Sequence, residues 1–90
     1  MGPVADRLRD VLQQRFQPER LDITDDSARH AGHAGAHPGG ESHFTVSIVS
    51  SAFAGLSRIE RQRQVHAALA QELAGPVHAL SVKASAPGEP

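Results

Sequence analysis

The stretch "HFTVSIVS", residues 43 to 50, is the clearest strand signal in this sequence of 90 residues. Its apolar residues Phe44, Val46 and Ile48 alternate with residues that are mostly polar. An alternation of period two places one set of side chains against a core and the other set on the opposite face of a sheet. The stretch therefore predicts a half-buried strand, on which the rest of the fold is built.

Upstream of this strand, a helix and a second strand are expected. Apolar residues recur at helical spacing over residues 3 to 16, with charged and amide side chains between them. Pro3 suits the first turn of this helix, and Pro18 ends the pattern. "RLDITD", residues 20 to 25, alternates like a short strand. Residues 27 to 41 would then form a glycine-rich loop, too long for a tight hairpin turn.

Downstream, the chain predicts a turn at "SAFAGL" and then one long helix. Ser57 followed three residues later by Glu60 is a capping-box pattern, which predicts a helix over residues 57 to 73. Gly75 and Pro76 follow in the order typical of a helix end. The buried face of this helix is expected to consist of Ile59, Val65, Ala68, Leu69 and Leu73.

The last strand is predicted at "VHALSVKA", residues 77 to 84. Leu80 and Val82 share one face of this strand, and His78 has the same parity. We therefore expect His78 to begin the strand on its core side. An imidazole at that place is either a hydrogen-bonded structural group or a ligand or catalytic base.

These elements predict an α+β fold, a three-stranded sheet with helices on one face. The opposite face, with Thr45, Ser47 and Ser81, would be polar. A single domain is expected over residues 3 to 85, followed by a disordered tail at residues 86 to 90.

The composition limits the classes of protein to which this chain can belong. Nine basic and ten acidic side chains give a net charge of −1, which is not the basic surface typical of nucleic-acid binders. The absence of cysteine excludes disulfides and thiolate chemistry. No stretch approaches the about 20 apolar residues of a membrane helix, and no secretory signal begins the sequence, so we expect a cytoplasmic protein that does not enter membranes.

The residues that could carry chemistry are mostly histidines. His30, His33 and His37 lie in the glycine-rich loop, and His43 opens the strand after it. Imidazole is a common metal ligand, although a solvated loop histidine is the simpler interpretation of His37. No nucleophile is placed with a general base, so the sequence does not predict an enzyme.

Four blocks of the sequence resemble a known family, the BolA family. They are "HAGH" at 30 to 33, "GESHF" at 40 to 44, "VSSAFAGLS" at 49 to 57 and "VHALSV" at 77 to 82. The resemblance extends over residues 5 to 86. It implies a fold similar to the class II KH domain, with the topology α-β-β-α-α-β.

The resemblance also implies a partner rather than a substrate. Proteins similar to this one pair with monothiol glutaredoxins and share a [2Fe-2S] cluster, for which the glutaredoxin and its glutathione supply the sulfur ligands. The BolA-like side would contribute His78 and one loop histidine, His30 or His33. Imidazole in place of thiolate raises a cluster's reduction potential, as in Rieske centres. We therefore expect a non-enzymatic protein for iron–sulfur cluster assembly, transfer or iron sensing, monomeric when alone.

The alternative is a nucleic-acid-binding regulator of transcription, because the implied fold is KH-like. Its contacts would come from Arg58, Arg61 and Arg63, a cluster that a solvated helix face explains equally well. No GxxG loop is present, since Gly55 has no glycine three residues later, and weak binding at most is expected. The family usually carries Arg-His-Arg on this helix, where Gln62 replaces the histidine here.

Overall fold

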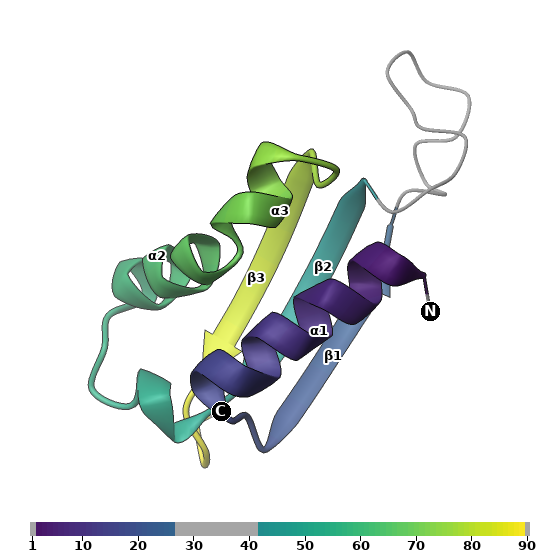
Figure 1. Ribbon diagram of the computed structural model, residues 1–90. Coiled ribbons are helices and arrows are strands. Elements are labelled where there is room, and N and C mark those ends of the chain that lie inside the picture. The colour runs from purple at the N-terminus through teal and green to yellow at the C-terminus, as the bar shows by residue number, and fades with distance from the viewer. Residues whose placement is uncertain (1, 27–41, 90) are drawn as a thin grey trace.

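The computed structural model describes residues 2–26 and 42–89 (Figure 1). The predicted loop at 27 to 41, with His30 and His33, lies outside the described residues. In chain order the elements are α1 (Pro3–Phe16), β1 (Arg20–Asp25), β2 (His43–Val49), the short 3-10 helix η2 (Ser51–Phe53), α2 (Arg58–Ala68), α3 (Ala70–Ala74) and β3 (Ala79–Ser85). The turn expected at "SAFAGL" contains η2.

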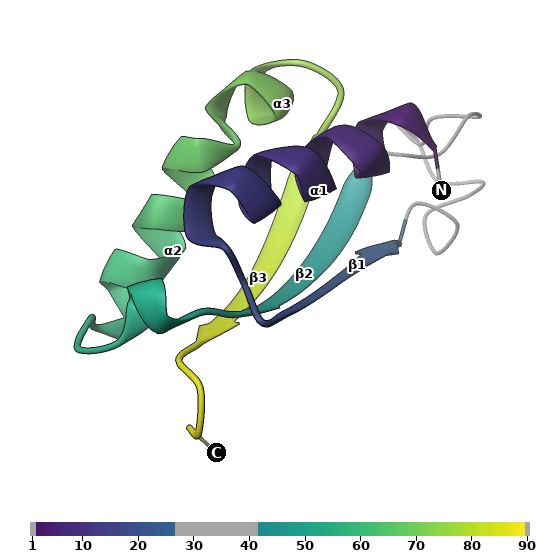
Figure 2. The same ribbon diagram turned by 60° about the horizontal axis from the view of Figure 1, so that its bottom comes forward.

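The sheet has the order β1-β2-β3, with β2 in the centre. β1 pairs with β2 in the antiparallel sense, and β3 pairs with β2 in the parallel sense. Parallel neighbours need a long crossover connection, which the segment containing α2 and α3 supplies. Figures 1 and 2 show all three α-helices on the same face of the sheet. The predicted α+β fold class, a three-stranded sheet with helices on one face, is confirmed.

The core lies between the sheet and the helices. Phe44, Val46 and Ile48 of β2 are buried, as their alternation predicts, while Thr45 is exposed on the opposite face. Buried residues of the helices pack against these side chains. They are Leu8, Leu12 and Phe16 of α1, Val65 of α2, and Leu69 between α2 and α3. The polar face predicted for the sheet is therefore the solvent face.

Ser50 joins the end of α1 to the end of β2. Its buried hydroxyl donates to the carbonyl of Phe16 at 2.6 Å and accepts from the amide of Ala52 at 3.1 Å. The rings of Phe16 and Phe53 pack beside it, with centroids 4.9 Å apart. A buried hydroxyl with both partners present satisfies backbone groups that the helix end and the turn would otherwise leave unpaired.

The predicted helix at 57 to 73 begins correctly but is interrupted. The capping box is present: the Ser57 hydroxyl accepts from the Glu60 amide at 3.1 Å, and the Glu60 carboxylate accepts from the Ser57 amide at 3.2 Å. The helix then divides at Leu69, whose φ of −103° and ψ of 21° depart from helical values. Two helices, α2 and α3, therefore replace the single one expected.

The expectation that Ile59 is buried is wrong. Its side chain is 63% exposed, whereas Val65 on the same helix is fully buried. At about 100° per residue, Ile59 lies about 120° around the helix from Val65, and so it points away from the core.

No described helix is long and apolar enough to cross a membrane.

The residues after β3, expected to belong to a disordered tail at residues 86 to 90, are described as far as Glu89. Ala86 is buried, and the Glu89 amide donates to the Ala86 carbonyl at 3.2 Å to close a turn. Gly88 has a φ of +84°, a conformation that glycine adopts without strain. The contact that holds this turn is an ion pair with α2, which connects residues far apart in the sequence.

Candidate functional site

One end of the sheet carries His78 together with Asp26 and Ser42, the residues that flank the segment with the loop histidines. β1 ends there and both β2 and β3 begin there, because β1 runs against β2 and β3 runs with it. The amide of Asp26 donates to the carbonyl of His43 at 2.7 Å, and the Thr45 hydroxyl donates to the Asp26 carboxylate. The chain therefore leaves β1 and enters β2 at neighbouring points of this end.

The loop histidines are connected to this same end by the chain itself. Residues 27 to 41 join Asp26 to Ser42, and both of these flanking residues form backbone hydrogen bonds at this end. His30 follows Asp26 by four residues, a contour length of at most about 14 Å. His30 and His33 themselves lie outside the described residues.

His78 lies at the entry to β3. Its amide donates to the carbonyl of Ser42 at 2.7 Å, and the next amide, that of Ala79, donates to the same carbonyl at 3.2 Å. Val77 before it is buried and is held by its amide to the carbonyl of Glu72, at 2.9 Å. The backbone of His78 is thus bonded to β2 and flanked by an anchored residue.

The expectation that the His78 side chain faces the core is wrong, because the residue is exposed. β3 begins at Ala79, so His78 belongs to the connection from α3 and not to the alternating part of the strand. Parity along a strand predicts a face only where the backbone is already extended and paired. The result is an imidazole that solvent or another protein can reach.

The neighbouring imidazole of His43 is engaged locally. It is half-buried, and its Nδ1 atom lies 2.9 Å from the hydroxyl of the buried Ser42. Within residues 2–26 and 42–89, no group of three or more histidines, cysteines or carboxylates could hold a metal ion.

The three arginines of the alternative interpretation do not form one basic surface. Arg58 and Arg63 are exposed, but only 14% of the Arg61 side chain is. Arg61 forms two hydrogen bonds to the Glu89 carboxylate, at 2.6 and 2.8 Å. The hydrogen bond from Arg61 lowers the pKa of Glu89 to about 2. The positive charge of Arg61 is therefore already balanced by Glu89 of the same chain.

The sequence did not predict this pair, and no local signal could have done so. Arg61 and Glu89 are 28 residues apart, and the pairing depends on how α2 lies along β3. Gln62, noticed only as a departure from the family pattern, donates to the carbonyl of Val82 at 2.6 Å. This hydrogen bond also connects α2 with β3.

Comparisons with known proteins agree with this fold. The family model described as BolA-like protein matches residues 12–89. The chain belongs to the BolA family. The resemblance inferred from the four sequence blocks is confirmed.

Relatives of this BolA-family chain occur in animals and plants. BolA-like protein 1 of Homo sapiens is 47% identical over 89 residues, which cover 99% of this chain and 62% of that protein. SufE-like protein 1, chloroplastic/mitochondrial, of Arabidopsis thaliana is 40% identical over 93 residues, which cover 99% of this chain and 25% of that protein. The chain thus spans about three-fifths of the length of the BolA-like protein 1 relatives, 61–63%.

Solved structures show the same BolA fold. The BolA domain of SufE1 from Arabidopsis thaliana superposes with a TM-score of 0.89 at 39% identity, over 100% of this chain and 99% of that one. The solution structure of BolA1 from Mus musculus gives a TM-score of 0.79 at 44% identity, over 97% of this chain and 68% of that one. The BolA fold thus extends over nearly the whole of this chain.

Proposed function

We propose that this BolA-family chain is a non-enzymatic partner of a monothiol glutaredoxin. The two proteins would share a glutathione-dependent [2Fe-2S] cluster for cluster assembly, transfer or iron sensing. The observation that carries the proposal is the placement of His78. Its imidazole is exposed while its backbone is bonded to Ser42, at the end of the sheet to which the segment with His30 and His33 is attached.

The donor set of the chain fits a shared cluster better than a complete metal site. Imidazole nitrogen suits iron, and His78 with His30 or His33 would provide two such ligands. The sequence has no cysteine, so thiolates have to come from the glutaredoxin and glutathione. When bound, the cluster would supply one-electron redox chemistry, and neutral imidazole ligands raise its reduction potential.

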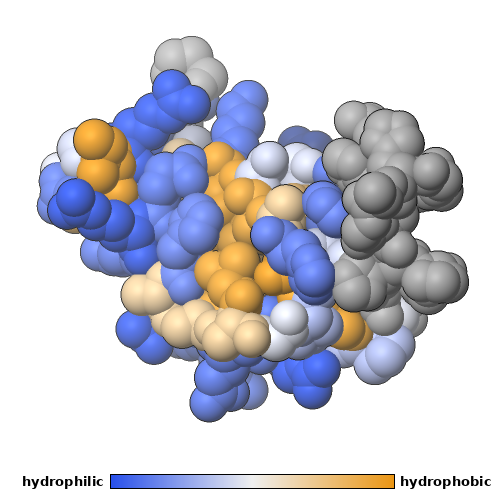
Figure 3. Space-filling model, turned by 90° about the horizontal axis from the view of Figure 1, so that it is seen from above, coloured by the Kyte–Doolittle hydropathy of each residue, from blue (hydrophilic) through white to orange (hydrophobic). Residues whose placement is uncertain are grey.

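The surface around this end is suited to a protein partner. Figure 3 looks onto the end of the sheet where β2 and β3 begin, and shows hydrophobic surface through the middle of the face with hydrophilic residues around it. A hydrophobic centre with a polar rim is the usual anatomy of a protein interface. A partner that docks at this end of the sheet would cover the exposed imidazole of His78 and exclude water from a cluster held between the two proteins.

The proposal is tested by reconstitution. The purified chain is mixed with a monothiol glutaredoxin, iron, sulfide and glutathione, and visible absorption and circular dichroism are recorded with the native mass. We expect a one-to-one complex that carries the cluster and a spectrum distinct from that of the glutaredoxin homodimer. The chain alone should run as a monomer. A spectrum identical to that of the glutaredoxin homodimer, with no mixed complex, would contradict the proposal.

A further inference from the structure

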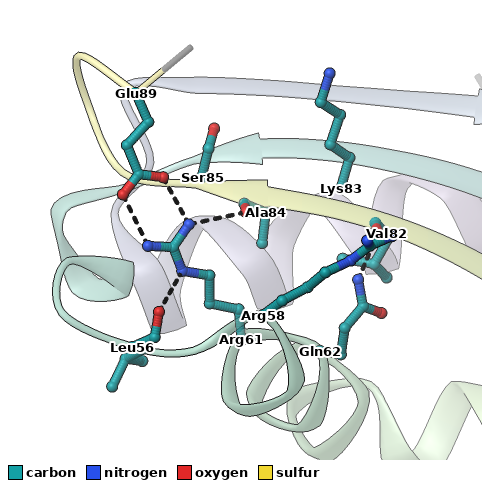
Figure 4. A pocket seen from close by; sticks show the side chains of 9 residues that line it. All are labelled: Leu56, Arg58, Arg61, Gln62, Val82, Lys83, Ala84, Ser85 and Glu89. Carbon is teal, nitrogen blue, oxygen red and sulfur yellow. Dashed lines mark hydrogen bonds and ion pairs between the residues drawn. The ribbon is translucent and has the colours of Figure 1, made fainter.

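A second feature of the molecule lies away from His78, in the groove between α2 and β3. There the guanidinium of Arg61 is held from both sides. Its Nε atom donates to the carbonyl of Leu56 at 3.1 Å, and its Nη1 atom donates to the carbonyl of Ala84 at 3.4 Å. Figure 4 shows the side chain crossing from α2 to β3. These two hydrogen bonds fix the orientation of the guanidinium. The N–H groups that meet Glu89 are therefore preorganised.

The position in front of this guanidinium is filled by the chain's own carboxylate. Both oxygens of Glu89 contact Arg61, in the bidentate arrangement that suits carboxylates. Glu89 is 36% exposed and follows the end of β3, with Pro87 and Gly88 also exposed. Ala86 is the last buried residue before it. The carboxylate can therefore leave Arg61 without disturbing the sheet.

The groove holds more positive charge than Glu89 neutralises. It has a volume of about 620 Å³, and its walls include Leu56, Val82 and the second guanidinium, that of Arg58. In Figure 4 the Arg58 side chain extends toward Val82, whereas Lys83 points away from α2. The described residues give Arg58 no ion-pair partner. The groove thus contains two guanidinium groups, of which the Glu89 carboxylate contacts only that of Arg61.

From this geometry we infer that the groove between α2 and β3 is a carboxylate-binding site for an acidic segment of a partner protein, with Glu89 as its internal occupant. A partner carboxylate would take the place of Glu89 on Arg61, and a second acidic side chain would meet Arg58. The resident group is a carboxylate in a part-apolar groove on a chain of net charge −1, which favours an acidic peptide over nucleic acid. The inference does not depend on the cluster or on His78.

The experiment removes the internal occupant in the full chain with Glu89→Gln. The probe is a blocked peptide with the sequence Ala-Pro-Gly-Glu-Pro, the same as residues 86–90, and the matched control peptide has glutamine in place of its glutamate. Binding is followed by the NMR signal of the Arg61 Nε–H group. We expect the peptide to bind the variant about ten-fold more tightly than the unaltered chain, since a tethered competitor reduces the apparent affinity to the fraction of sites that it leaves free, here about one tenth. The control peptide should not bind.

Three further variants test which residues are involved. Arg58→Gln should weaken the binding of a peptide with two glutamates, while Arg63→Gln, an exposed arginine on the same helix, should not change it. Glu89→Asp keeps the charge on a shorter side chain and should give an intermediate affinity, which tests the inference if Glu89→Gln does not fold.

Equal affinity of the Glu89→Gln variant and the unaltered chain for the peptide would overturn the inference. So would tighter binding of inorganic phosphate or of a short DNA duplex than of the acidic peptide, since either would make the groove a phosphate site. The spectrum of the mixed complex with glutaredoxin should be the same for Glu89→Gln and the unaltered chain. A change in that spectrum alone would therefore concern the cluster and not the groove.

Discussion

The main-chain amide of His78 donates a 2.7 Å hydrogen bond to the carbonyl of Ser42. This bond joins the residue before β3 to the residue before β2, at the point where the segment with the loop histidines returns to the sheet. A side chain on such a backbone needs little ordering when a ligand arrives, because only its own rotamers remain to be restricted. His78 is therefore the preorganised half of the proposed ligand pair.

Replacing His78 by alanine should abolish the spectrum of the mixed cluster while the two proteins still associate. The free energy of unfolding of the variant should lie within about 0.5 kcal/mol of that of the unaltered chain. The residue is exposed, and the hydrogen bond from its main-chain amide to the Ser42 carbonyl is kept. The matched control is His66→Ala, an imidazole on α2 whose Nδ1 atom lies 2.8 Å from the Gln62 carbonyl. A normal cluster spectrum in a folded His78→Ala variant would show that the ligand assignment is wrong.

The loop ligand should behave differently. A single change at His30 or His33 should be partly rescued by the other histidine, because both belong to the segment attached at Asp26. The double change His30→Ala with His33→Ala should lose more than the two single changes together, a non-additive effect expected of residues that substitute for each other. The yield of the mixed cluster measures this, and His37→Ala is the control. Strictly additive losses would mean that the two histidines have separate roles.

Binding to nucleic acid should be weak and strongly reduced by salt. Arg61 is occupied by Glu89, which leaves Arg58 and Arg63 of the predicted cluster. Each neutralised phosphate of duplex DNA contributes about −0.9 to the slope of log affinity against log salt, so the slope should not exceed about −2. Fluorescence anisotropy of a labelled duplex over a salt series measures it. Submicromolar, sequence-specific binding would instead support the regulator of transcription.

The Arg61–Glu89 pair should contribute to stability at neutral pH and lose that contribution in acid. The pKa of Glu89 is lowered to about 2 from its usual value of 4.5, first by the hydrogen bond from Arg61 and then by that from the Ala86 amide. A carboxyl group whose folded pKa is depressed stabilises the fold above its unfolded pKa, and this stabilisation declines as the pH falls through the folded value. Urea midpoints of the unaltered chain and Glu89→Gln should therefore converge between pH 4.5 and about 2. A difference that is independent of pH would contradict the prediction.

The two faces of α2 should respond differently to truncation. Val65→Ala removes fully buried methyl groups and should destabilise the domain by about 2 kcal/mol. Ile59→Ala removes more atoms from a side chain that is 63% exposed, and its cost should stay below about 0.5 kcal/mol. Chemical denaturation of both variants measures the contrast. Equal losses would mean that Ile59 is covered in solution.

The sequence predicted those features that depend on neighbouring residues. The alternation in β2 and the capping box of Ser57 and Glu60 are local patterns, and both are present. The placement of His78 was not predicted correctly, because its parity was counted along a strand expected from residue 77, whereas β3 begins at Ala79. The break at Leu69 and the contact of Arg61 with Glu89 arise from packing of distant segments, which a local pattern does not contain.

The hydrogen bonds from α2 to β3 also affect how the sheet meets other chains. β3 is an edge strand, yet the carbonyls of Val82 and Ala84 already accept from Gln62 and Arg61. An incoming strand would have to displace both donors before it could pair there, which protects this edge against sheet extension and aggregation. The opposite edge carries charge instead, with Arg20 and Asp22 joined at 3.0 Å on β1. Each edge of the sheet thus has its own barrier to an added strand.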